Sequence, residues 1–224
     1  MPWKIYGYLI IFALCISCTP QIHTSSSLLM KQSIPNTHSE TRGQATFAGG
    51  CFWCMEGPYQ ETAGVFDAVN GYAGGSAEDA SYGLVARGNT EHREAVQVTY
   101  DPQKISYEAL LDIFWRQINP TDTGGQFADR GFQYTTAIYY HNDTQKELAE
   151  ASKQQLQASG KFDTPIATQI LSYSTFFLAE EYHQNYYLKA SEHYQRYKKG
   201  SGRADFIEEN WARKAALEAA DEGY

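Results

Sequence analysis

The chain has 224 residues, of which 42% are hydrophobic, 14% aromatic and 20% charged. This length predicts one folded domain with a tail, and the composition excludes a wholly disordered protein. Eighteen Lys and Arg against 26 Asp and Glu give a formal net charge of −8, so we expect no nucleic-acid partner, because neutralising phosphates needs clustered basic side chains.

The first 17 residues have the features of an export signal. Lys4 supplies a positive charge, and the apolar run over residues 9–14 is shorter than the roughly 20 residues that span a bilayer. The Ile-Ser-Cys sequence that ends at Cys18 resembles a bacterial lipobox, although Cys15 stands where that pattern prefers leucine. We expect residues 1–17 to be a signal peptide, Cys18 to be lipidated, and the protein to be an exported lipoprotein facing the periplasm or cell exterior. An ordinary cleaved signal peptide and an uncleaved anchor are the alternatives.

Residues 18–44 have the composition of a linker. They are rich in Ser, Thr, Pro and Gln and show little hydrophobic periodicity. We expect a flexible tether, in which His23 and His38 are solvated, and a folded domain over residues 45–224.

The first half of the domain combines short apolar runs with glycine turns. Residues 45–50 (ATFAGG) predict a strand that ends in a tight turn. The next residues, CFWCMEG, predict a helical turn that begins at Cys51 and that Pro58 should end or kink, because proline lacks an N–H. Strands are expected over residues 65–70 and over residues 94–100, where apolar and polar side chains alternate.

The second half of the domain contains the clearest helical patterns. Residues 106–120 predict an amphipathic helix with Ser106 as its N-cap, and residues 142–159 predict a polar helix that is followed by Gly160. Because strands and helices mix without strict alternation, an α+β fold is favoured over a doubly wound sheet. The remaining expected elements are strands at 136–140 and 166–173 and helices at 180–199 and 204–218.

The sharpest local feature is the sequence Gly-Gly-Cys-Phe-Trp-Cys, which contains Cys51 and Cys54. A cysteine that begins a helix faces unpaired N–H groups and the positive end of the helix dipole, and both favour the nucleophilic thiolate. The second cysteine can reach the first to form a disulfide. A structural disulfide or two buried thiols, a zinc site and a thioredoxin-like oxidoreductase are the alternatives.

Separated blocks of the sequence then resemble one family, peptide methionine sulfoxide reductase A. The blocks are GGCFWCMEGPYQ, GYAGG, YGLVARGNTEHREAVQVTYDP, NPTDTGGQFADRGFQYTTAIYY and FFLAEEYHQNYY, in the family's order and spacing. The resemblance covers residues 46–198 and implies a two-layer α+β sandwich with a small mixed sheet and a ferredoxin-like core, flanked by helices and long loops.

The resemblance also implies a role for each matched residue. Cys51 matches the nucleophile that attacks the sulfoxide sulfur, and Glu94 matches the acid that protonates the sulfoxide oxygen. Because no cysteine follows Cys54, the chain looks like the subtype in which Cys54 is the resolving thiol. Tyr82 and Tyr134 match tyrosines that bind the oxygen, and Asp129 matches an acid that organises the site. Phe52 and Trp53 match aromatics that receive the S-methyl group. His183 matches a position near the site, where we expect it to bind the substrate.

These residue types suit the reduction of a sulfoxide. Sulfoxide sulfur is a poor electrophile until its oxygen accepts a proton, so burial should raise the pKa of Glu94 and keep it protonated. The reaction would leave Cys51 as a sulfenic acid, which condenses readily with a neighbouring thiol. The product would be a disulfide between Cys51 and Cys54.

We therefore expect a monomeric enzyme that reduces methionine-S-sulfoxide, free or in oxidised proteins, and so repairs those proteins. Thioredoxin or a thioredoxin-like domain would recycle it, and it would need no metal and no organic cofactor. A general disulfide oxidoreductase, which would not need Glu94, is one alternative function. An exported binding lipoprotein, in which Cys51 would be dispensable, is the other.

Overall fold

The computed structural model describes residues 42–212. The predicted signal peptide, Cys18, nearly all of the predicted tether and the end of the last predicted helix lie outside the described residues. Within the described part, the first strand begins at Gly43, two residues before the expected start of the domain. No helix between residues 42 and 212 is both long and apolar enough to cross a membrane.

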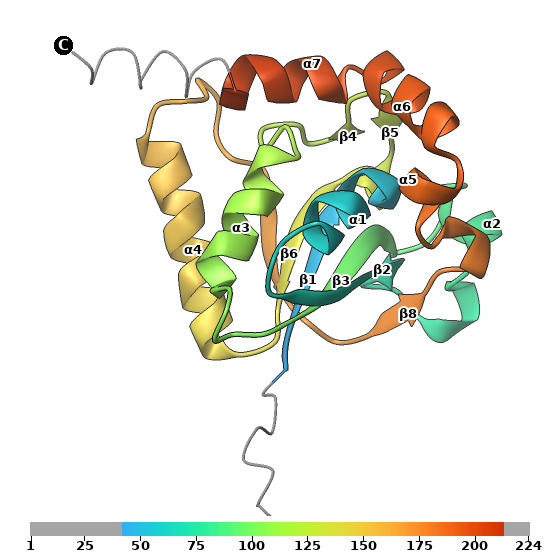
Figure 1. The fold of residues 1–224 in the computed structure, drawn as a ribbon, viewed down its shortest axis with the longest axis horizontal. Coiled ribbons are helices and arrows are strands. Elements are labelled where there is room, and N and C mark those ends of the chain that lie inside the picture. Colours follow the sequence, from blue (N-terminus) through green and yellow to red (C-terminus); the bar gives the residue numbers. More distant parts are fainter. Residues whose placement is uncertain (1–41, 213–224) are drawn as a thin grey trace, which may run out of the picture. The chain divides into compact units, whose positions relative to one another are not determined.

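A six-stranded mixed sheet forms the centre of the structure (Figure 1). Its order is β7-β6-β1-β3-β2-β8, with β6 and β7 parallel and all other neighbours antiparallel. A separate two-stranded ribbon pairs β4 with β5. The strands are β1 (Gly43–Gly49), β2 (Val65–Ala73), β3 (Arg93–Tyr100), β4 (Gly125–Gln126), β5 (Asp129–Arg130), β6 (Thr136–Tyr140), β7 (Gln169–Ser172) and β8 (Phe176–Leu178).

The helix α4 is the longest of the described helices, with 16 residues, and α3 and α6 have 10 each. In Figure 1, α1 and α3 lie across one face of the sheet and α5 lies beside α1. They are α1 (Phe52–Gln60), α2 (Tyr82–Val85), α3 (Tyr107–Arg116), α4 (Asp143–Ala158), α5 (Tyr186–Lys189), α6 (Ser191–Gly200) and α7 (Arg203–Ile207). Single 3₁₀ turns occur at Ala77–Asp79, Phe132–Tyr134 and Glu181–His183, and a π-helical turn occurs at Glu208–Ala212.

The predicted α+β class and ferredoxin-like core are confirmed. In chain order the central elements are β1, α1, β2, β3, α3 and β6, and their strands lie in the antiparallel order β6-β1-β3-β2. This is the βαββαβ arrangement of a ferredoxin-like fold. The helices α3 and α4 begin as predicted, because the Ser106 hydroxyl accepts a hydrogen bond from the backbone of α3 at 3.2 Å and the Asn142 side chain does so for α4 at 2.9 Å.

One aromatic cluster fixes the position of α1 on the sheet. The ring of Phe47, on β1, stacks against Tyr59 of α1 and Phe114 of α3, with centroids 5.3 and 5.4 Å apart. All three side chains are fully buried, and such aromatic pairs stabilise a fold by roughly 0.5–1.5 kcal/mol each beyond the burial of their area. The end of β1 and the start of α1 are therefore held close together.

Of the two predicted effects of Pro58, ending or kinking the helix, the first does not occur at the proline itself. Pro58 lies inside α1, which continues to Gln60. The proline lacks the N–H that would donate to the carbonyl of Cys54, and α1 ends two residues later. The backbone N–H of Glu61 donates to Gly57 O at 3.0 Å, and the Thr62 hydroxyl donates to Pro58 O at 2.7 Å.

The predicted helix over residues 180–199 is confirmed only in part, because two breaks divide it into a 3₁₀ turn and the helices α5 and α6. Asn185 adopts a left-handed conformation with φ +54°, which asparagine tolerates better than most residues. Its backbone N–H donates to the buried carboxylate of Glu56 at 2.7 Å, so a contact with α1 holds this break. A second break at Ala190 separates α5 from α6. The strand expected over residues 166–173 is shorter, and β8 was not expected.

Candidate active site

Cys51 lies where β1 passes into α1. It occupies the N-cap of the helix, directly after Gly50, which has φ +82°. A Cβ added to Gly50 would lie 2.5 Å from the side chain of Gln126 and 2.8 Å from the guanidinium of Arg203. Both the conformation and the crowding therefore require glycine, and the turn directs Cys51 toward the site.

A cavity of about 140 Å³ lies beside Cys51. Its walls come from α1, α2, β3, β5, the turn at Phe132–Tyr134 and α6, which the tertiary fold brings together. A larger surface cavity of about 560 Å³ beside Arg93 contains neither cysteine of the described residues. The smaller cavity is lined by Cys51, Phe52, Trp53, Tyr82, Glu94, Asp129, Tyr134 and Tyr197.

Glu94 is a buried acid next to the nucleophile. It is 2% exposed, and its carboxyl group accepts a hydrogen bond from the backbone N–H of Phe52 at 3.1 Å. Burial raises the pKa of Glu94 to about 8, and the charges of Asp129 and Cys54 add to the rise, while the Phe52 N–H and Arg203 oppose it. The predicted rise is confirmed, and the carboxyl group carries a proton at neutral pH.

Cys51 and Cys54 form a hydrogen-bonded pair of free thiols. Burial raises the pKa of Cys51 well above its usual range, and Cys54 and Glu94 add to the rise. The expectation that the helix N-terminus favours the Cys51 thiolate is therefore wrong, because desolvation outweighs a dipole effect of about 0.3–1 kcal/mol. The hydrogen bond from Cys51 lowers the pKa of Cys54 to about 7, with help from the positive charges of Arg203 and Lys198.

Three tyrosine hydroxyls border the cavity. Burial raises the pKa values of Tyr82, Tyr134 and Tyr197 above the usual range, so each remains a neutral hydrogen-bond donor. The Tyr197 hydroxyl donates to the carboxylate of Asp129 and fixes it at the cavity wall. Tyr197 was not predicted, and as one of 17 tyrosines it carries no local signal that distinguishes it.

His183 lies behind the wall of the cavity. Its Nδ1 accepts a hydrogen bond from the indole N–H of Trp53 at 3.2 Å, and its ring centroid is 5.0 Å from that of Phe52. It is 1% exposed and does not line the cavity. The predicted contact with substrate is therefore replaced by a positioning role, in which His183 and the stacked ring of Tyr186, 3.9 Å away, orient Trp53.

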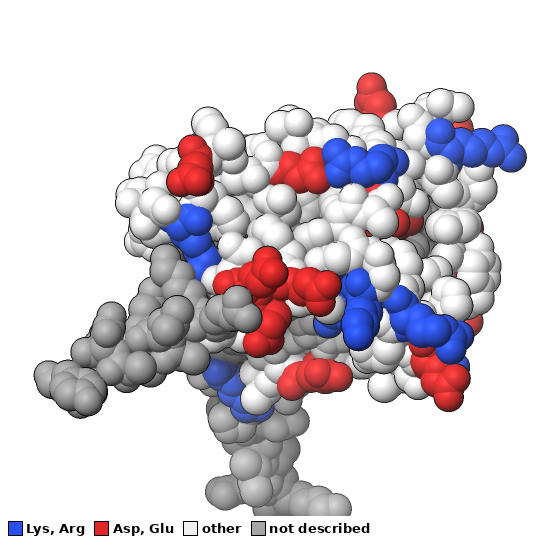
Figure 2. Space-filling model, turned by 90° about the horizontal axis from the view of Figure 1, so that it is seen from above, with Lys and Arg blue, Asp and Glu red and all other residues white. Residues whose placement is uncertain are grey.

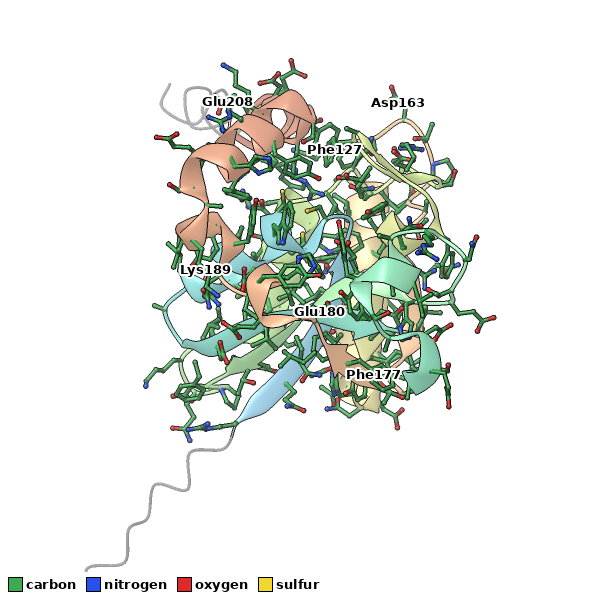
Figure 3. All side chains as sticks on the ribbon, turned by 90° about the vertical axis from the view of Figure 1, so that its right-hand side faces the viewer. Phe127, Asp163, Phe177, Glu180, Lys189 and Glu208 are labelled. Carbon is green, nitrogen blue, oxygen red and sulfur yellow. The ribbon has the colours of Figure 1, made fainter. Side chains whose placement is uncertain are left out.

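Glu180 supports the site and was not predicted. Its carboxylate accepts hydrogen bonds from the Tyr72 hydroxyl at 2.7 Å and from the backbone N–H of Tyr82 at 2.9 Å. In Figure 3 it is labelled near the centre of the view. Because it bridges β2 and α2, Glu180 fixes the position of Tyr82 at the cavity.

Acidic and basic side chains are mixed on the face of the molecule that Figure 2 shows. Figure 2 shows acidic and basic side chains interspersed over the described part of one face, without a continuous basic patch there. This face therefore offers no surface of the kind that neutralises a run of phosphates.

Comparisons with known proteins agree with the geometry. Residues 43–215 match a family model described as "Peptide methionine sulfoxide reductase". Proteins named "Peptide methionine sulfoxide reductase MsrA" from Bacillus subtilis and Bacillus velezensis are 57% and 55% identical to this chain, covering 79% and 77% of it and 99% and 98% of their own lengths. The crystal structure of Mxr1 from Saccharomyces cerevisiae in reduced form is similar, with a TM-score of 0.64 and 33% identity over 67% of this chain and 87% of that one.

Proposed function

The chain belongs to the peptide methionine sulfoxide reductase family, and from that premise we propose that Cys51 and Glu94 act together as nucleophile and acid. The enzyme reduces methionine-S-sulfoxide to methionine at the expense of thiols and so repairs oxidised proteins. One observation carries the assignment of roles. The buried, protonated carboxyl group of Glu94 is bonded to the residue that follows Cys51, and both side chains line one cavity.

The first chemical step transfers oxygen between two sulfur atoms. Glu94 donates its proton to the sulfoxide oxygen, while the hydroxyls of Tyr82 and Tyr134 hold that oxygen by hydrogen bonds. The Cys51 sulfur then attacks the activated sulfur and forms a transient S–S bond. The hydroxyl group passes from the substrate sulfur to Cys51 as one S–O bond breaks and another forms, the S–S bond breaks, and methionine leaves with Cys51 as a sulfenic acid. The proton that Cys51 loses replaces the one that Glu94 gave, so the step balances as thiol plus sulfoxide to sulfenic acid plus thioether.

The size of the cavity supports binding of the end of a methionine sulfoxide side chain. About 140 Å³ is the share of roughly five water molecules in the liquid, which admits the end of one methionine sulfoxide side chain. Phe52 and Trp53 provide an apolar wall for the S-methyl group. Since only the side chain has to enter, the free amino acid and protein-bound residues both fit.

Cys54 is proposed as the resolving thiol. It is free, hydrogen-bonded to Cys51, and ionised more readily than Cys51. Its thiolate attacks the Cys51 sulfenic acid, hydroxide leaves and takes up a proton, and a Cys51–Cys54 disulfide forms. A thioredoxin or thioredoxin-like domain then reduces this disulfide by thiol exchange.

The test of the reaction uses separated S and R epimers of methionine sulfoxide with dithiothreitol as reductant. We expect methionine from the S epimer only, and a loss of more than about 1,000-fold in Cys51→Ser because the nucleophile is absent. Activity that survives in Cys51→Ser contradicts the assigned nucleophile. A folded protein that reduces neither epimer would instead support a general disulfide oxidoreductase, which an insulin-reduction assay would detect.

Export as a lipoprotein is a separate proposal that rests on the sequence of residues 1–18. We expect mass spectrometry of membrane-extracted protein to find Cys18 as the lipid-bearing N-terminus. An unmodified N-terminus at any other residue contradicts the proposal.

A further inference from the structure

Arg203, the first residue of α7, is a buried cation beneath the site. It is 1% exposed, and its guanidinium donates to Gln117 O at 2.6 Å and to Gly49 O at 3.0 Å. The guanidinium carbon lies 4.8 Å from the centre of the Phe127 ring, which Figure 3 labels. Among the ion pairs of residues 42–212, none includes Arg203. A full positive charge is thus buried against carbonyl dipoles rather than against a carboxylate.

Such an arrangement is costly unless an anion compensates the charge. The Gly49 carbonyl that binds Arg203 stands two residues before Cys51, so the charge lies under the turn that carries the nucleophile. The nearby carboxyl group of Glu94 is protonated at neutral pH, so of these two neighbouring acids only Asp129, whose carboxylate also binds the Tyr197 hydroxyl, offsets the charge. The same guanidinium donates to Met55 Sδ at 3.9 Å, next in the chain to the fully buried Cys54, and Cys54 is a group that becomes an anion during the reaction.

We propose that Arg203 is a positioning residue that provides the positive charge against which the Cys54 thiolate forms, and thereby controls the disulfide step. This inference rests on the proposed role of Cys54 as the resolving thiol. The inference means that α7, about 150 residues from the cysteine motif, supplies the positive charge that the motif itself lacks.

Cys54 carries negative charge at two points of the cycle. In the resolving step its thiolate attacks the Cys51 sulfenic acid, the S–S bond forms, and the S–O bond breaks to release hydroxide. In recycling, a thiolate of a dithiol reductant attacks the disulfide at Cys51, which is 6% exposed and lines the cavity, and the fully buried Cys54 leaves as a thiolate. The buried guanidinium, which contacts the neighbouring Met55, stabilises that thiolate in both steps.

Other groups face Cys54 and must be weighed against Arg203. Asp129 and Glu94, when ionised, oppose a thiolate, whereas Lys198 favours one from a half-buried position on α6. The charge of Arg203 lowers the pKa of Cys54 more than the charge of Lys198 does. Because Arg203 is buried, salt screens its charge less. The titratable and charged groups that face Cys54 are Cys51, Glu94, Asp129, Tyr194, Lys198 and Arg203.

The experiment follows two events in a single turnover of the full chain. Reduced enzyme is mixed with excess methionine-S-sulfoxide and quenched at intervals between pH 6 and 9, and released methionine and lost thiols are counted separately. In Arg203→Met, which removes the charge and keeps a long unbranched side chain, we expect the ratio of the disulfide rate to the methionine-release rate to fall about tenfold at pH 7. The pH midpoint of the disulfide step should rise by about one unit, which is the same factor.

Two further variants separate charge from structure. Arg203→Lys keeps the charge but not the paired carbonyl bonds, and it should retain a midpoint close to that of wild type. Arg196→Met, which removes an exposed arginine from α6, should change neither event. An unshifted midpoint in Arg203→Met, or an equal shift in Arg203→Lys, overturns the inference. If wild type releases methionine without losing both thiols, the resolving role of Cys54 fails, and this inference fails with it.

Discussion

Replacing Glu94 with glutamine should lower kcat/KM for methionine-S-sulfoxide by about 100- to 10,000-fold at pH 7. Glutamine fits the same buried position and keeps a hydrogen-bond donor, but it has no proton to transfer. The loss therefore measures proton donation to the sulfoxide oxygen rather than the shape of the cavity. Glu91→Gln is the matched control, because Glu91 is an exposed carboxylate three residues earlier in the chain.

The pH dependence gives the same prediction a second readout. The pKa of Glu94 is raised to about 8, so the carboxyl group is protonated below that pH and loses its proton above it. Wild-type kcat/KM should fall as the pH rises through about 8, and this fall should be absent from Glu94→Gln. Tyr82 and Tyr134 remain protonated in this range. If the variant kept the wild-type profile, the acid would have to be another group.

Replacing Cys54 with serine should give an enzyme that turns over once and then stops. The first step needs only Cys51, so a burst of about one methionine per active site is expected. Turnover with a thioredoxin-type reductant should fall by more than about 100-fold, because no disulfide forms for it to reduce. The Cys51 sulfenic acid should accumulate, and a reagent that labels sulfenic acids would detect it by mass.

The control for this prediction is the wild-type enzyme, which should lose two thiols for each methionine that it releases in the absence of reductant. Dithiothreitol should restore part of the turnover of Cys54→Ser, because a small thiol can enter the cavity and attack the sulfenic acid directly. Recycling of the variant by a thioredoxin-type reductant at the wild-type rate would contradict the resolving role.

Most of the cavity could be predicted because its residues lie in short, ordered blocks of sequence. Seven of the eight lining residues were named from those blocks, and only Tyr197 was missed. Only the tertiary structure identifies Tyr197 as part of the site, because it brings the residue to the cavity wall and to Asp129, 68 residues away in the chain. Arg203 was not predicted either, because an arginine on a short C-terminal helix is ordinarily solvated and no local pattern indicates its burial.

The amino-acid sequence by itself determined the features that depend on neighbouring residues. The caps at Ser106 and Asn142 and the glycine turn before Cys51 all follow from local hydrogen bonds and backbone freedom. Alternating side chains likewise predicted the strand β3. These interactions act over a few residues, so a local pattern suffices to predict them.

Only the tertiary structure decided where the helical segment around Asn185 is interrupted and which groups of the site are ionised. The left-handed break at Asn185 depends on the carboxylate of Glu56, which comes from another helix. The protonation of Cys51 depends on burial and on the neighbouring Cys54 and Glu94, which reversed the expectation drawn from the helix dipole alone. Desolvation is a property of the whole surrounding shell of atoms, and segments distant in the chain build that shell.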